Sequence, residues 1–468
     1  MRASEGPADG PATSWGRAPL VQLPDGTVKQ TSPLTGTVVW TVPGRAHRLL
    51  GAPPAERRPV DHSLDGAHCA FCPARHLETP PEKSRVVRAA DGTWTTLERV
   101  PAAALDDTVA ELRRIPNLFE IVSADYWRTN HGHVPSAAAQ ARATAYVADP
   151  AGRAHVLAVL RRRRASQGVT DAEWEAAGDD HWLERAVDLF DGTHDVLVAR
   201  RHHVDGASYD DELAGSGTLT PEEHHQYVAL AVAAMADLYA AQPRARYVAV
   251  FQNWLRPAGA SVDHLHKQLV AIDEYGPRAE RVLARVAEDP RVFAGVVDHA
   301  VEHGLVVAEN EHAVAVAGVG HRYPSLEVYS RAREHAPWEH DPAQVRAMAD
   351  LVHAMHAATG VTVPTNEEWH HRPPDVPAAR GPMPWHVVLK WRTSTLAGFE
   401  GSTKINVNTL APATLRDLVV ERLTALRAQG AVADVRVGAE CARRHPALRY
   451  AERPGALGRG RRGGDSPG

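Results

Sequence analysis

One stretch, residues 247–272, constrains the fold more than any other; it reads YVAVFQNWLRPAGASVDHLHKQLVAI. The apolar run from Tyr247 to Phe251 predicts a buried strand, and a loop containing Gly and Pro separates it from a second strand that opens at His264. Side chains alternate along a strand, so His264, His266 and Gln268 are expected on one face. Two imidazoles and an amide suit a metal ligand, a nucleophile and a donor to oxygen. The same residues also fit an ordinary solvated strand face, and this pattern alone leaves both interpretations open.

The composition indicates a globular protein with enough core for two or three domains. The chain has 468 residues, of which 44% are hydrophobic and 23% charged. A formal charge of −5, spread without blocks, argues against a dedicated nucleic-acid binder. Three cysteines are too few for a disulfide framework and indicate a reducing, cytoplasmic compartment. We find neither a signal peptide nor an apolar run long enough to span a bilayer, so no membrane association is expected.

A Cys-x-x-Cys pair, Cys69 and Cys72, is a candidate metal site, because two thiolates at this spacing bind one ion from a tight turn. A redox pair is the alternative interpretation. The third cysteine, Cys441, lies in a polar tail, so a zinc ion here requires histidines from elsewhere in the chain. His68 and His76 are the candidates nearest in the sequence.

The histidine strand and its approach match a family pattern. Phe251-Gln252-Asn253, Gly259-Ala260-Ser261 and His264-Leu265-His266-Lys267-Gln268 together resemble the core of the galactose-1-phosphate uridylyltransferase family. That family belongs to the histidine-triad superfamily, whose members transfer or hydrolyse nucleotides. Its pattern is aromatic-acidic-Asn, then Gly-x-Ser, then His-Pro-His-x-Gln, at the spacing found here. Leu265 stands in place of the proline and Gln252 in place of the usual Glu; related diadenosine phosphorylases tolerate a non-proline there.

Other segments resemble the family in the same order. Pro33-Leu34-Thr35-Gly36 reads as a turn before a strand from Thr37 to Val42, and the resemblance implies that Arg45 and Arg48 reach substrate phosphates, partly across a dimer interface. Asn117 matches a position near the bound nucleotide. A homodimer is therefore expected.

The resemblance also implies the site chemistry. His266 is the expected nucleophile, Gln268 and Ser261 the expected donors to phosphoryl oxygens, and Asn253 a neighbour of the nucleotide phosphates. One structural zinc ion is implied. Its ligands are Cys69, Cys72, His203 and His264, with His202 as the adjacent alternative to His203.

The second half resembles a degenerate copy of the first. Leu305 to Val316 predicts two short strands, and Asp341-Pro342 begins a helix that ends before Gly360. Trp385 to Lys390 takes the place of a second histidine strand. Two imidazoles, His312 and His386, remain, but Val388 replaces a ligand, so a second metal ion is not expected. Glu400, in Gly398-Phe399-Glu400, resembles a residue near the acceptor sugar.

These features predict an α+β fold of two tandem histidine-triad-like repeats, with antiparallel sheets and packed helices. The expected segments are a disordered 1–19, a first repeat 20–285 with a helical insertion at 123–191, a degenerate repeat 286–440 and a disordered 441–468. The insertion is expected to contain helices at 137–147 and 154–164, and a capping box predicts a helix from Pro221 to about Ala241.

The predicted function is nucleotidyl transfer from a nucleotide sugar to a sugar 1-phosphate through a covalent nucleotidyl-histidine. A histidine-triad hydrolase or phosphorylase of dinucleotides or nucleotide conjugates is the alternative. A non-catalytic, zinc-stabilised nucleotide-binding protein is the third possibility. The sequence identifies neither the sugar nor the base.

Overall fold

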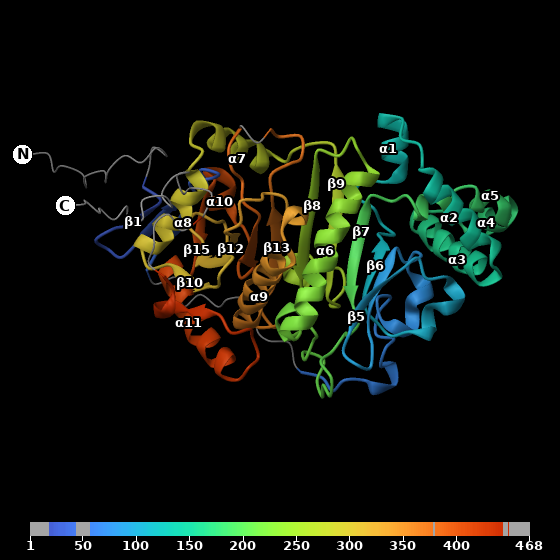
Figure 1. Ribbon diagram of the computed structural model, residues 1–468, viewed down its shortest axis with the longest axis horizontal. Helices are drawn as coiled ribbons and strands as arrows, with labels where there is room; N and C mark the ends of the chain where they lie inside the picture. The colour runs from blue at the N-terminus through green and yellow to red at the C-terminus, as the bar shows by residue number, and fades with distance from the viewer. Residues whose placement is uncertain (1–17, 44–56, 378–379, 443–447, 449–468) are drawn as a thin grey trace, which may run out of the picture.

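A long antiparallel sheet of twelve strands runs through the protein (Figure 1). The computed structural model describes residues 18–43, 57–377, 380–442 and 448. From one edge of the sheet to the other the strands are β16 (Arg436–Val437), β10 (Val306–Glu309), β11 (Ala313–Ala317), β12 (Ser325–Ser330), β14 (His386–Trp391), β13 (Thr365–His370), β8 (Tyr247–Trp254), β9 (His266–Ile272), β7 (His194–Ala199), β6 (Ala110–Pro116), β4 (Ser84–Arg88) and β5 (Trp94–Glu98).

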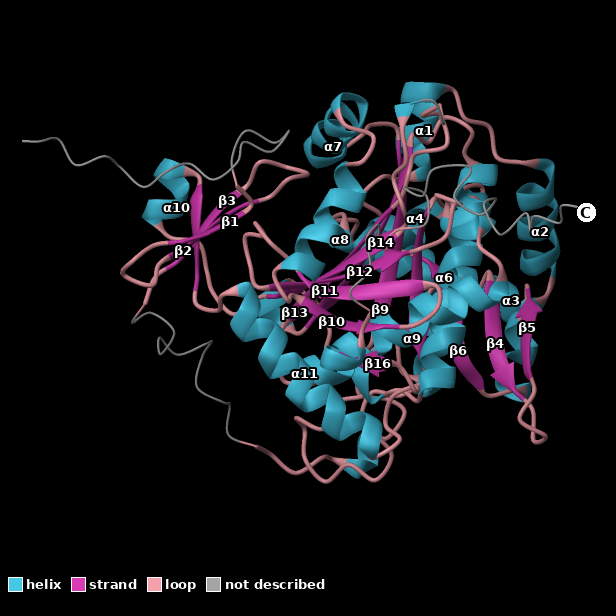
Figure 2. Ribbon diagram, turned by 60° about the vertical axis from the view of Figure 1, so that its left-hand side comes forward, coloured by secondary structure: helices cyan, strands magenta, loops and turns pink. Residues whose placement is uncertain are grey.

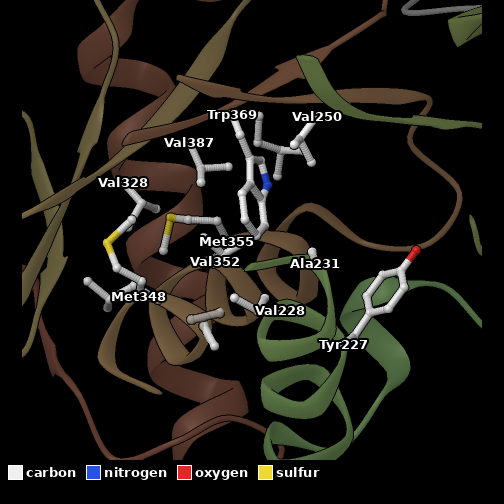
Figure 3. Packing of buried hydrophobic residues seen from close by; sticks show 14 of the residues in the cluster. Tyr227, Val228, Ala231, Val250, Val328, Met348, Val352, Met355, Trp369 and Val387 are labelled. Carbon is white, nitrogen blue, oxygen red and sulfur yellow. The ribbon is translucent and has the colours of Figure 1, made fainter. Parts of the chain in front are cut away.

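Three long helices cover one face of this sheet: α6 (Pro221–Ala241), α9 (Pro342–Thr359) and α11 (Pro412–Ala428). Thr220 begins α6 with a capping box in which its hydroxyl accepts from the backbone N–H of Glu223. The apolar sides of α6 and α9 meet the sheet in the main core, where Trp369 of β13 packs near Met355 of α9 (Figure 3). Apolar side chains on this face of the sheet are therefore buried against the helices.

A buried ion pair on the helix-covered face fixes the orientation of the histidine strand. The Lys267 ammonium contacts a carboxylate oxygen of Glu367 on β13, and both side chains are fully buried. The other oxygen of Glu367 lies 2.6 Å from Nε2 of His356 on α9. Because alternate residues of a strand face opposite ways, His266 and Gln268 lie on the face away from α6 and α9.

Strands from the two predicted repeats share the long sheet. They meet where β8 pairs with β13 through five residue pairs, from Thr365–Trp254 to Trp369–Val250. The sheet therefore continues without interruption across the predicted boundary near residue 285, while the tandem-repeat interpretation itself stays a prediction.

The predicted insertion is helical and has its own core. Its helices are α1 (Ala124–His131), α2 (Ala137–Ala148), α3 (Pro150–Ser166), α4 (Asp171–Ala177) and α5 (Asp179–Leu183). The insertion packs on the short helix η2 (Pro73–Glu78), which directly follows Cys72. Nε2 of His155 donates to the carbonyl of Thr79 at 2.7 Å, and Arg162 pairs with Glu78 at 2.8 Å. One role of the insertion is thus to brace the segment after the Cys-x-x-Cys turn.

A smaller sheet has no strand in common with the long one (Figure 2), and contacts it through the turn between β11 and β12, where the Asn408 amide donates to the carbonyl of His321 at 3.1 Å. It contains β1 (Leu20–Gln22), β2 (Val28–Thr31), β3 (Val38–Thr41) and β15 (Ile405–Asn408), with β3 and β15 parallel, and α10 (Gly398–Thr403) packs on it. Two further helices, α7 (Pro277–Glu288) and α8 (Val292–Glu302), follow β9 in the chain, and α8 packs against β11.

The predicted α+β class, with antiparallel sheets and packed helices, is confirmed. The histidine strand begins two residues later than predicted, because its first ladder pair joins His266 to Val198. Cys441, assigned to the disordered tail by the sequence, is instead buried and belongs to a second core together with Leu448. In the described segments no helix has both the length and the apolar character needed to cross a membrane.

Candidate metal centre and nucleophile

Four potential metal ligands, Cys69, Cys72, His202 and His264, converge from three separate segments. The two sulfur atoms lie 3.8 Å apart. Nδ1 of His264 lies 3.5 Å from Sγ of Cys69 and 3.6 Å from Sγ of Cys72. Nδ1 of His202 lies 3.6 Å from Sγ of Cys72.

These separations fit a tetrahedral zinc site. Zn–S bonds of about 2.3 Å and Zn–N bonds of about 2.0 to 2.1 Å give S–S edges of about 3.8 Å and S–N edges of about 3.6 Å. The observed distances of 3.8, 3.5, 3.6 and 3.6 Å agree with those edges. A set of two thiolates and two imidazoles is also one that zinc prefers. The donor set therefore fits zinc both in geometry and in chemistry.

A backbone hydrogen bond orients His264, and the two cysteines perturb each other's pKa. Nε2 of His264 donates to the carbonyl of Ala199 at 2.6 Å, which leaves the lone pair of Nδ1 directed at the sulfur atoms. The hydrogen bond from Cys69 lowers the pKa of Cys72, and the same bond together with burial raises the pKa of Cys69. A bound zinc ion would hold both cysteines as thiolates, because only the deprotonated sulfur binds the ion.

The geometry favours His202 over the predicted His203 as the fourth ligand. His203 instead forms a β-bridge with Leu213, and its ring lies 4.8 Å from that of His68. The two histidines are adjacent, so the local backbone, and not the spacing, decides which ring faces the cysteines. His68 and His76 lie outside the four-residue group found among the described residues.

His266 is held in one tautomer. Its Nδ1 donates to the carbonyl of His264 at 2.8 Å, so the lone pair resides on Nε2. Burial lowers the pKa of His266, so the ring is neutral near pH 7. A neutral ring with an available Nε2 is the state that a nucleophilic histidine requires.

Gln268 is oriented by a residue that the sequence analysis did not identify, His194. The backbone N–H of Ile121 donates to Nδ1 of His194 at 3.1 Å, so Nε2 of His194 carries the proton. That N–H donates to Oε1 of Gln268 at 3.1 Å, and the Asn117 amide donates to the same oxygen at 3.3 Å. The Gln268 oxygen is thereby engaged on both sides, which directs its NH₂ group away from His194. Burial lowers the pKa of His194 to about 4, so the ring stays neutral.

Not all the predicted site residues lie in this group. Asn253 on β8 accepts from the Asn366 amide at 2.7 Å, while Ser261 is exposed in the loop before β9. Glu400 lies in α10, where it accepts from the backbone N–H of Ala397, and α10 packs on the smaller sheet. Arg45 and Arg48 lie outside the described residues.

The two candidate histidines of the second half are separate. His386 is buried on β14, stacked on Tyr329 with ring centroids 5.1 Å apart. His312 lies in the turn between β10 and β11. The described residues do not bring them into one metal-binding group.

A pocket of about 250 Å³ lies beside the cysteine cluster, with His62, His68, His202 and His203 in its wall. Cys72 also faces this pocket, whereas His266 is absent from the described lining residues. The pocket therefore adjoins the metal centre and not the nucleophile.

Sequence comparison identifies the family of the chain. The family described as "Domain of unknown function (DUF4921)" matches residues 23–450. The chain belongs to this family. Comparison of this DUF4921 protein with curated proteins gives no significant match.

Two solved structures resemble this DUF4921 protein over most of its length. One is an ADP-glucose phosphorylase from Arabidopsis thaliana, at 18% identity and a TM-score of 0.55, covering 84% of this chain and 97% of that chain. The other is a GalT-like protein from Arabidopsis thaliana, at 18% identity and a TM-score of 0.52, with the same coverage. The predicted resemblance to the galactose-1-phosphate uridylyltransferase family is thus confirmed at the level of the fold.

Proposed function

We propose that this protein is a nucleotidyltransferase that moves a nucleoside monophosphate from a nucleotide sugar to a sugar 1-phosphate through a nucleotidyl group on His266. The observation that carries the proposal is the tautomer of His266, whose Nδ1 donates to the His264 carbonyl and whose Nε2 bears the lone pair. The fold shared with a GalT-like protein and an ADP-glucose phosphorylase supports the same class of chemistry.

In the first step, Nε2 of His266 attacks the α-phosphorus of the nucleotide sugar. The N–P bond forms as the bond from that phosphorus to the bridging oxygen breaks, and sugar 1-phosphate leaves with the electron pair. The ring acquires positive charge, which the His264 carbonyl stabilises through the Nδ1–H hydrogen bond. The NH₂ group of Gln268 donates to a non-bridging oxygen, and we assign a similar role to Ser261.

In the second step, a phosphate oxygen of the acceptor attacks the same phosphorus and the N–P bond breaks. His266 regains its lone pair and the nucleotide leaves on the acceptor.

We propose that Cys69, Cys72, His202 and His264 hold one zinc ion. With four protein ligands, the ion would anchor the start of the histidine strand and would have no open coordination position. Asn117 and Asn253 then contact the nucleotide.

The acceptor distinguishes the proposed transferase from the alternative phosphorylase or hydrolase, and the fold shared with an ADP-glucose phosphorylase supports testing both. The protein is loaded with radiolabelled nucleotide from UDP-glucose or ADP-glucose, freed of substrate, and offered sugar 1-phosphate, inorganic phosphate or buffer. We expect rapid discharge by sugar 1-phosphate and slow discharge by the other two. Faster discharge by inorganic phosphate would identify a phosphorylase, and equal discharge in buffer a hydrolase; either would overturn the transferase assignment.

Replacing His194 with Phe is expected to lower kcat by about 10-fold to 100-fold, because the Gln268 amide loses the donor that orients it. KM should change less, since the contact from Gln268 matters most as charge moves at phosphorus. Steady-state kinetics with the preferred nucleotide sugar measure both values.

His194→Gln is the matched control, because its side-chain NH₂ can replace the Nε2–H donor. This variant should recover more activity than His194→Phe, and both should keep their zinc, since His194 is not among the four candidate ligands. Wild-type kcat in His194→Phe would contradict the positioning role.

A homodimer, in which Arg45 and Arg48 reach substrate phosphates partly across the interface, stays a prediction from the sequence. The position of Glu400 near the acceptor sugar is a separate prediction.

A further inference from the structure

The end of α8 and the residue that caps it carry a second group of potential metal ligands, His299, Glu302 and His303. Their spacing, i, i+3 and i+4, places them on one side of the helix. Their ligand atoms all lie within 4.8 Å of one another, and the two imidazole centroids are 3.9 Å apart.

The nitrogens of this group are available to a metal ion. Nδ1 of His303 donates to the backbone carbonyl of His299 at 3.0 Å, so its lone pair is on Nε2. Nε2 of His299 is buried and has no hydrogen-bond partner among the described residues. A buried polar nitrogen without a partner is unfavourable, and a metal ion would satisfy it.

We propose that this turn of α8 binds a divalent transition-metal ion through His299, Glu302 and His303. Imidazole ligands favour zinc, cobalt, nickel or copper over calcium and magnesium, which prefer oxygen. The carbonyl end of the helix dipole also favours a cation. Glu302 and His303 are exposed, so the ion reaches the site directly from solvent.

This site differs from the cysteine cluster in position and in chemistry. Helix α8 packs on β11, on the opposite side of β8 from the histidine strand β9 in the long sheet (Figure 1). The α8 site supplies three ligands and no sulfur. At least one coordination position would therefore stay open to water or to a further ligand. The proposal therefore does not depend on the function of His266.

Cobalt(II) tests the proposal, because only the cysteine cluster gives thiolate-to-cobalt charge-transfer absorption. The full-length protein without a histidine tag is stripped of metal and titrated with micromolar Co²⁺. Wild type should bind two equivalents, one of them without the thiolate band. His303→Ala should bind one fewer, and because His303 is exposed the variant should fold normally.

The controls separate the two sites. His312→Ala, a change in the turn between β10 and β11, should still bind two equivalents. Cys69→Ser with Cys72→Ser should retain one equivalent without the thiolate band. The proposal is overturned if His303→Ala binds as much cobalt as wild type. It is also overturned if wild type binds only one equivalent and that equivalent shows the thiolate band. A single equivalent without that band, lost in His303→Ala, would support the α8 site and count against the cysteine site.

Discussion

His266→Asn is expected to abolish turnover, with kcat reduced by about 10⁴-fold or more, as is typical when a covalent nucleophile is removed. Asparagine keeps part of the shape of histidine but offers no nucleophilic nitrogen in place of Nε2. Intact-mass spectrometry after incubation with a nucleotide sugar should show a nucleoside-monophosphate adduct in wild type and none in the variant. The adduct should be acid-labile, as phosphoramidates are.

Metal content separates a lost nucleophile from a damaged site. His266→Asn should retain zinc, because His266 is not among the four clustered ligands. His264→Asn should lose zinc and activity together, since Nδ1 of His264 lies 3.5 and 3.6 Å from the two sulfurs. Wild-type rates in His266→Asn, or an adduct on another residue, would refute the proposed mechanism.

Acid should unfold the protein well above the pH at which carboxylates titrate. Four buried histidines away from the cysteine cluster have lowered pKa values because of burial: His224 and His386 well below 6.5, His353 to about 4 and His371 to about 3. Below pH 6.5 the unfolded chain binds these protons and the folded chain does not, so stability falls as the pH falls from about 6.5 to about 4.

The expected effect is large. Each such histidine removes up to about 1.4 kcal/mol per pH unit, so four remove up to roughly 5.6 kcal/mol per unit, which is comparable with the total stability of many domains. Urea denaturation followed by circular dichroism at a series of pH values measures this slope. Unchanged stability between pH 6.5 and 5 would contradict the prediction.

His224 offers the sharpest control. Neither of its ring nitrogens has a hydrogen-bond partner among the described residues. It faces His353 and His356 of α9, with Glu367 and Lys267 of the sheet also close enough to influence its charge. Because no hydrogen bond is lost, His224→Leu should be tolerated near pH 7. The loss of unfolding free energy per pH unit should be smaller in this variant by the contribution of one histidine. An unchanged slope would show that His224 does not contribute.

The parts of the site that the sequence predicted well are those determined by local spacing. Cys69 and Cys72 are fixed by one turn, and His264, His266 and Gln268 by two-residue alternation along one strand. Strand and helix positions in the first half followed from apolar runs and capping residues, as in α6.

The parts that could not be predicted depend on pairing between distant segments. His194 approaches Gln268 because β7 and β9 pair with His194 opposite Val270, and nothing near residue 194 states that register. The alternation of β7 could have placed His194 on the same face as Val196 and Val198, but not beside Gln268. The choice between His202 and His203 likewise depends on the backbone after β7, which a bridge to Leu213 determines.

The pairing of β8 with β13 has a consequence for any shortened form of the chain. Without the second half, β8 would become an edge strand, with a row of unpaired backbone groups beside the nucleophile strand and open to pairing with other chains. Lys267 would also lose Glu367 and remain as an unpaired charge in an apolar interior. The second half thus supplies both the strand that covers the edge of β8 and the carboxylate that pairs with Lys267.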